Sequence, residues 1–149
     1  MYKNCEMKRI KEEAAALQLK YPAEFADMPC STLAGIANGY GPERWPENLR
    51  KLVTWIFRHY PAPAAIHDVR YEFSDGSELT RKAADAEFAA NLKIVWKYYY
   101  GRFRWVNIIA LYGFFKIISA AAMTRRFGRS AWLDSFRKKH SGKEVRSNE

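Results

Sequence analysis

Apolar residues recur at intervals of three and four along much of this chain, which is the spacing of one face of an α-helix. One such stripe lies between positions 49 and 57, and another runs from 88 to 96. Between them, Ile66, Val69 and Phe73 keep the same spacing. No stretch shows the apolar–polar alternation that is typical of a β-strand. The sequence therefore predicts a mainly α fold.

Residues that begin and end helices divide the N-terminal third. Asn4 can cap a first helix over residues 4–20, and Pro22 is expected to end it. Residues 29–46 are rich in glycine, proline, serine and asparagine, which predicts a long irregular loop. Long ordered loops are often functional, so this segment is the first candidate for a binding loop.

Prolines also divide the middle of the chain. Pro46 suits the first turn of the next helix. Pro61 and Pro63 are expected to break the helical pattern, which resumes over residues 64–73. After a turn, we expect Thr80 to cap the helix that carries the last apolar stripe.

The length of 149 residues fits one domain, expected over residues 1–140, followed by a polar, flexible tail over residues 141–149. The net charge of +9 is uneven, because residues 61–91 sum to −3 whereas residues 92–149, with 13 basic and 3 acidic residues, sum to +10. A basic excess favours an anionic partner, namely a phospholipid membrane surface, an acidic protein or nucleic acid. Nucleic acid is the less favoured partner, because the acidic middle does not resemble a phosphate-binding surface.

Cysteine content and the N-terminus bear on the cellular compartment. Cys5 and Cys30 allow at most one disulfide and form no CxxC pair, so free thiols are expected. The first residues are charged throughout and lack the apolar core of a secretory signal. We therefore expect synthesis in the cytoplasm without a signal peptide, with later release or membrane association left open.

The most apolar window spans the 19 residues 105–123, which is near the minimum for crossing a bilayer. Lys116 and Asn107 within the window favour a core helix instead. In that helix five apolar residues would face the preceding helices: Ile108, Leu111, Tyr112, Phe115 and Ile118. Both interpretations stay open on sequence alone. Basic and aromatic residues around the window are candidates for contact with a membrane surface: Arg102, Arg104, Trp105, Arg125, Arg126 and Trp132.

One group of residues could carry chemistry. His67 and Tyr71 are four residues apart and share a helix face, while Asp68 points to a different neighbour. Asp85 precedes Phe88 by three residues and so lies on an apolar stripe, where a carboxylate is costly unless polar groups meet it. If the two helices pack antiparallel, His67 and Tyr71 are its natural partners. A histidine oriented by an aspartate is a general-base arrangement that could activate water.

A cation is a second candidate in the same region. Asp68 could hold one, and the loop around Gly39 and Gly41 could add backbone carbonyls as hard oxygen ligands for calcium. Such a metal would polarise a carbonyl oxygen while water activated by His67 attacks.

The segments His-Asp-Val-Arg-Tyr at 67–71 and Ala-Asp-Ala-Glu-Phe at 84–88, downstream of Asn-Gly-Tyr-Gly, resemble the secreted phospholipase A2 superfamily. The similarity is to its parvovirus-type, bacterial and phage-associated branches and covers roughly residues 36–92. Residues 93–140 then form a C-terminal basic and apolar helical region. The resemblance implies two antiparallel core helices that carry the His/Asp site, an irregular glycine-containing calcium loop and additional helices.

The resemblance also implies roles for the catalytic residues. His67 would be the base that deprotonates water, Asp85 its orienting partner, and Tyr71 a second donor to Asp85. The implied reaction is calcium-dependent hydrolysis of the sn-2 ester of glycerophospholipids.

The metal ligands follow from the same resemblance. Asp68 would bind Ca²⁺ together with backbone carbonyls of Gly39, Gly41 and Glu43, and the Gly41 amide would help to stabilise the oxyanion. Many family members tie this loop to the catalytic helix with a disulfide, and the matching positions are Tyr40 and Ala64. The loop of this chain therefore lacks that covalent link.

Two other functions remain open at this point. One is a catalytically silent phospholipase-like protein with a structural or membrane-interaction role in a phage or mobile element. The other is nucleic-acid binding through residues 92–149, which would depend steeply on salt.

Overall fold

The computed structural model describes residues 4–37, 46–48, 51, 55, 59–101, 112–124, 129 and 133. Across these residues the protein is mainly helical and forms no β-strand, which confirms the predicted mainly α class. Most of the helix expected after Pro46 and the whole tail at 141–149 lie outside the described residues.

The first helix, α1 (Asn4–Ala16), buries Met7, Ile10 and Ala14, which follow the helical spacing of three and four. It ends four residues before the predicted end at residue 20. Gln18 adopts a left-handed conformation with φ 52°, and the Leu19 amide donates to the Ala14 carbonyl at 3.0 Å. This arrangement satisfies the last carbonyls of the helix and stops it without the help of Pro22.

Two short helices follow, α2 (Ala23–Asp27) and α3 (Cys30–Ile36), each directly after a proline. The prediction of an irregular loop from residue 29 is therefore wrong for its first part. Leu33 and Ala34 are buried, and α3 packs on α1, so tertiary burial overrides the turn-forming composition. Residues 38–45, which make up most of the rest of that loop, lie outside the described part of the chain.

Helix α5 (Pro61–Glu72) begins at the prolines that were expected to break it. The first residues of a helix need no backbone N–H partner inside the helix, and the fixed φ of proline suits this position. The helix therefore starts at Pro61 rather than Ala64, and Pro63 is buried within it.

Helix α6 (Glu78–Tyr100) is capped by Ser77, not by Thr80 as predicted. The Ser77 Oγ accepts the Thr80 amide at 3.1 Å. Asp75 reinforces the turn, since its Oδ1 accepts the Thr80 hydroxyl at 2.7 Å and the Ser77 amide at 2.8 Å. The hydrogen bond from Thr80 lowers the pKa of the Asp75 carboxyl. Gly76 supplies the positive φ, 88°, that this tight turn needs.

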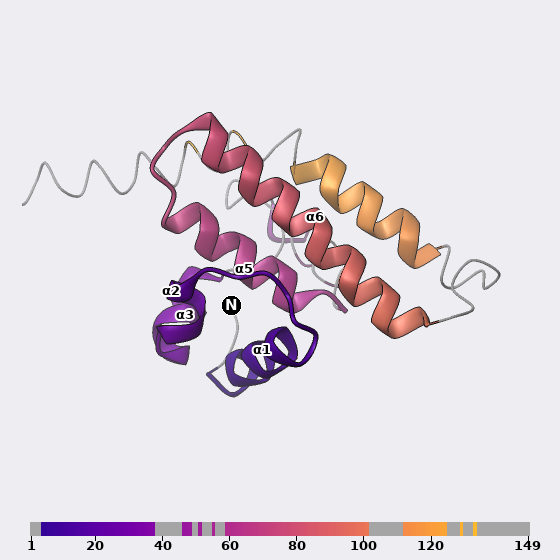
Figure 1. Ribbon diagram of the computed structural model, residues 1–149, viewed down its shortest axis with the longest axis horizontal. Helices are drawn as coiled ribbons and strands as arrows, with labels where there is room; N and C mark the ends of the chain where they lie inside the picture. Colours follow the sequence, from indigo (N-terminus) through magenta and orange to yellow (C-terminus); the bar gives the residue numbers. More distant parts are fainter. Residues whose placement is uncertain are drawn as a thin grey trace, which may run out of the picture.

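Helix α5 is the central element of the arrangement (Figure 1). It contacts α1, α2 and α3 and also packs against α6. Its residues Ala62, Ala65, Ile66 and Val69 are almost fully buried and belong to the core. The small alanine side chains allow neighbouring helices to come close. Helix α5 therefore packs against α1, α2 and α3 and also against α6.

Residues 112–124 form a further helix beside α6 (Figure 1), and the rings of Phe114 and Trp96 lie 5.3 Å apart. Ile117 and Ala120 are buried, whereas Tyr112, Phe115 and Ile118 are exposed. The prediction that Tyr112, Phe115 and Ile118 face the preceding helices is therefore wrong. Among the helices described, none is long and apolar enough to cross a bilayer. Residues 105–111, the start of the apolar window, lie outside the described part.

The Ser77 cap yields a stability prediction. Ser77→Ala should lower the free energy of unfolding by about 1 kcal/mol, because the Thr80 amide loses its side-chain acceptor. Urea denaturation followed by circular dichroism measures the loss. Ser31→Ala, at an exposed position in α3, is the matched control and should change stability much less. Equal losses in both variants would contradict the assignment of Ser77 as the cap.

Candidate functional site

The site lies between α5 and α6, which run antiparallel. The ring of His67 contacts that of Phe88, the hydroxyl of Tyr71 bonds Asp85, and Ser74 lies by Thr80. Residues later in α5 therefore contact residues earlier in α6, which is the order expected of antiparallel helices. The turn that connects the helices is short, since α5 ends at Glu72 and α6 begins at Glu78.

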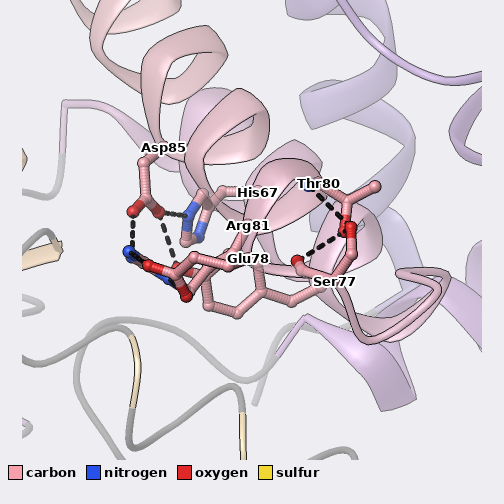
Figure 2. Close-up of polar contacts among 7 residues, drawn as sticks. His67, Ser77, Glu78, Thr80, Arg81 and Asp85 are labelled. Atoms are coloured by element: carbon pink, nitrogen blue, oxygen red, sulfur yellow. Dashed lines mark hydrogen bonds and ion pairs between the residues drawn. The ribbon is translucent and has the colours of Figure 1, made fainter.

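The carboxylate of Asp85 is the centre of the site and is 6% exposed. Its Oδ1 lies 3.1 Å from His67 Nε2 and accepts the Tyr71 hydroxyl at 2.6 Å. Its Oδ2 accepts Arg81 Nη1 at 2.7 Å. Figure 2 shows the contacts of His67 and Arg81 meeting at Asp85. A carboxylate taken out of water requires donors of this kind, because an unpaired buried charge is strongly unfavourable.

The imidazole of His67 is held in one orientation and one tautomer. Its ring lies 4.1 Å from the ring of Tyr71 and 4.8 Å from that of Phe88, measured between centroids. Because a carboxylate offers only acceptors, the His67 Nε2 that faces Asp85 carries a proton. Nδ1 is then the basic nitrogen, and it lies on the side of the ring away from the carboxylate. This is the geometry of a general base.

Tyr71 acts as a donor at neutral pH. Burial raises the pKa of its hydroxyl, and the hydrogen bond to the Asp85 carboxylate raises it further. The hydroxyl therefore keeps its proton and shares Oδ1 with His67. Two donors from α5 thus hold one oxygen of a residue on α6.

Asp68, the predicted metal ligand, follows His67 on α5, and its Oδ2 atom is buried. A carboxylate is a hard oxygen donor, which fits calcium. In the described segments, no group of three or more His, Cys, Asp or Glu residues is placed to hold a metal ion. The further ligands expected for calcium, Gly39, Gly41 and Glu43, lie outside the described residues, as does Tyr40.

The structure thus brings together three of the residues singled out in the sequence, His67, Tyr71 and Asp85, with Asp68 adjacent on α5. The predicted membrane-surface residues all lie outside the part of the chain that is described: Arg102, Arg104, Trp105, Arg125, Arg126 and Trp132.

Arg81 and Glu78 belong to the site but were not predicted from the sequence. The side chain of Arg81 is 8% exposed, and its Nε and Nη2 donate to the two Glu78 oxygens at 3.0 and 2.7 Å. The hydrogen bonds to Glu78 raise the pKa of Arg81, so the guanidinium stays charged. The signal was present, since Arg81 is three residues after Glu78 and four before Asp85, the spacings of helical ion pairs.

Another ion pair lies away from this site and links α5 to α6. Arg70 donates two hydrogen bonds to Glu87, at 2.9 and 2.8 Å, and its side chain is 38% exposed. These bonds raise the pKa of Arg70. The pair provides a natural comparison for Arg81, because it joins α5 to α6 without touching Asp85.

Compared with known proteins, the chain matches no protein-family model, no curated protein and no solved structure. The resemblance to phospholipases A2 therefore remains a prediction from the motifs. The observations that bear on function are the contacts that Asp85 of α6 makes with His67 and Tyr71 of α5.

The burial of Asp85 yields a second stability prediction. Asp85→Ala should lower the free energy of unfolding by about 1–3 kcal/mol, because His67, Tyr71 and Arg81 Nη1 lose their shared buried acceptor. Glu87→Ala, which breaks the more exposed pair with Arg70, should cost about 1 kcal/mol or less. Urea denaturation of both variants tests the difference. A loss for Asp85→Ala no larger than that for Glu87→Ala would show that the Asp85 network contributes little to stability.

Proposed function

We propose that this protein is a phospholipase A2-like hydrolase that cleaves the sn-2 ester of glycerophospholipids in a calcium-dependent reaction. The observation that carries the proposal is the contact of His67 Nε2 with Asp85 Oδ1 at 3.1 Å. Tyr71 holds the same oxygen, and the antiparallel helices match the arrangement that the motif resemblance implies. The metal and its ligand loop enter through that resemblance.

The proposed chemistry follows from the tautomer of His67. Its Nδ1 accepts a proton from a water molecule while the water oxygen attacks the ester carbonyl carbon. Asp85 Oδ1 stabilises the imidazolium that forms. The bond from the acyl carbon to the glycerol oxygen then breaks, and His67 returns the proton to that oxygen. The products are a fatty acid and a lysophospholipid, and the base is regenerated.

Calcium, when bound, would supply a positive charge that polarises the ester carbonyl. In the proposal Asp68 binds this ion, together with the carbonyl groups of Gly39, Gly41 and Glu43. The Gly41 amide would add a hydrogen bond to the developing oxyanion. Asp68 contributes a carboxylate that follows His67 directly on α5. The ion and the proposed base would therefore be held by the same helix.

The proposed place of action is an anionic phospholipid surface. Residues 92–149 carry a net charge of +10, and such a segment is attracted to anionic lipid. On the described helix 112–124, Tyr112 and Phe115 are 58% and 64% exposed and offer apolar and aromatic contact. The predicted membrane-surface residues flank this helix in sequence.

A catalytically silent phospholipase-like protein, with a structural or membrane-interaction role in a phage or mobile element, is the second candidate. Both oxygens of Asp85 are satisfied by donors within the protein. A purely structural polar network would show the same saturation. Retained binding to vesicles without ester cleavage and without calcium affinity would favour this second candidate.

Release of fatty acid from vesicles tests the catalytic role of His67. The wild-type protein should cleave anionic phosphatidylglycerol vesicles in calcium and lose this activity in EDTA. His67→Gln should lower the rate by about 10²- to 10⁴-fold, because glutamine cannot accept the proton of water. His59→Gln, at an exposed histidine, is the control and should keep the rate. Activity unchanged by His67→Gln, or by EDTA, would rule the mechanism out.

Calcium binding can be measured independently of turnover by isothermal titration calorimetry. We expect the wild-type protein to bind Ca²⁺, and Asp68→Asn to weaken the affinity by on the order of tenfold or more, because one ligand charge is lost. Asp27→Asn, at an exposed position in α2, should leave the affinity unchanged. Equal affinities in wild type and Asp68→Asn would place calcium elsewhere.

A further inference from the structure

The proposed mechanism makes no use of Arg81, although this residue is the most deeply buried cation described at the site. Its Nη1 contacts Asp85 through Oδ2, while His67 and Tyr71 contact Oδ1. Arg81 therefore touches the orienting carboxylate on the oxygen that faces away from the base.

This contact restricts the rotation of the carboxylate. The terminal torsion of an aspartate is broad and roughly two-fold, so packing alone fixes it poorly. Arg81 lies one helical turn before Asp85 on α6, whereas His67 and Tyr71 lie on α5. The carboxylate is thus held from its own helix on Oδ2 and from the neighbouring helix on Oδ1.

Glu78 in turn fixes the guanidinium. It accepts two hydrogen bonds, from Nε and Nη2, and leaves Nη1 directed at Asp85. A planar guanidinium suits this division, because one edge pairs with a carboxylate while another nitrogen donates elsewhere. The side chain of Glu78 is 49% exposed, so the chain of contacts runs from the surface to the buried carboxylate.

We propose that Arg81 is a positioning residue that orients the Asp85 carboxylate toward His67, with Glu78 holding the guanidinium in place. The consequence for catalysis rests on the proposed function, whereas the orientation of Asp85 does not. A simpler role for Arg81, bracing the first turns of α6, would leave the contact between Asp85 and His67 unchanged when Arg81 is replaced.

The hydrogen bond itself can be observed without any substrate. At one fixed pH, proton NMR of protein with ¹⁵N-labelled histidine should show a downfield Nε2–H signal, assigned by its loss in His67→Gln. In Arg81→Met, which keeps an unbranched apolar stem but removes the guanidinium and its donors, we expect this signal to move upfield and exchange faster with water. Arg70→Met, which breaks the ion pair with Glu87 of α6, is the matched control and should leave the signal in place.

The outcomes separate the two roles. A signal unchanged in folded Arg81→Met, or changed equally in Arg70→Met, would overturn the positioning role. If Arg81→Met does not fold, Arg81→Lys and Glu78→Gln replace it, because both keep polar groups at their positions. A shift of the signal in these two variants supports the proposal, and an unchanged signal in both overturns it.

Kinetics adds a second readout. With phosphatidylglycerol vesicles and calcium, Arg81→Met should lower kcat by about 10- to 100-fold with KM unchanged, as expected for a group that orients a catalytic partner. Arg70→Met should change neither value. A protein that cleaves no ester would remove the proposed function, while the NMR comparison would still decide the role of Arg81. Full kcat in folded Arg81→Met would overturn its role in catalysis.

Discussion

The burial of one carboxylate governs how the two central helices meet. Asp85 lies on the apolar side of α6, and its charge is tolerable there only because three donors surround it. Two of these donors, His67 and Tyr71, come from α5, and their contacts work only in one register of the two helices. A displacement by a single turn would take His67 and Tyr71 away from the carboxylate and leave Arg81, on the same helix, as the one donor of the three still in contact. The polar contacts therefore select the alignment, while apolar packing elsewhere supplies most of the stability.

Helix α5 serves the core and the site with different residues. Ile66 and Val69 are buried in the apolar cluster, while His67 and Tyr71, within two residues of them in sequence, retain partial exposure. The rigid packing of α5 against α1, α2 and α3 fixes the backbone on which the imidazole stands. The helix that carries the imidazole is also the one that packs against α1, α2, α3 and α6 among the described helices. This packing explains how a small domain can hold the imidazole within hydrogen-bonding distance of Asp85.

Sequence patterns predicted the helical class and the exceptional position of Asp85, because both depend on local spacing. They missed the start of α5 because a proline can either break a helix or begin one. They missed the cap of α6 because a serine can likewise lie in a turn or begin a helix. In both cases tertiary packing decides which. The exposed side of helix 112–124 was also missed, because a helix apolar on nearly every side offers no period from which to choose a face. Arg81 was missed for a different reason: a charged residue near the start of a helix is ordinarily solvated, and only the buried partner shows otherwise.

The charges around the site suit a base that gains a proton. Glu78, Arg81 and Asp85 together carry one net negative charge, which a protonated His67 would balance. Arg81 stands between the two carboxylates, so it limits their mutual repulsion and leaves Oδ1 of Asp85 available to the imidazole. The pair of Arg70 and Glu87 joins the same helices with no net charge and without contact to the imidazole. Arg81 contacts the carboxylate that holds His67 and Arg70 does not, so Arg81 rather than Arg70 is placed to influence how an imidazolium of His67 would be stabilised.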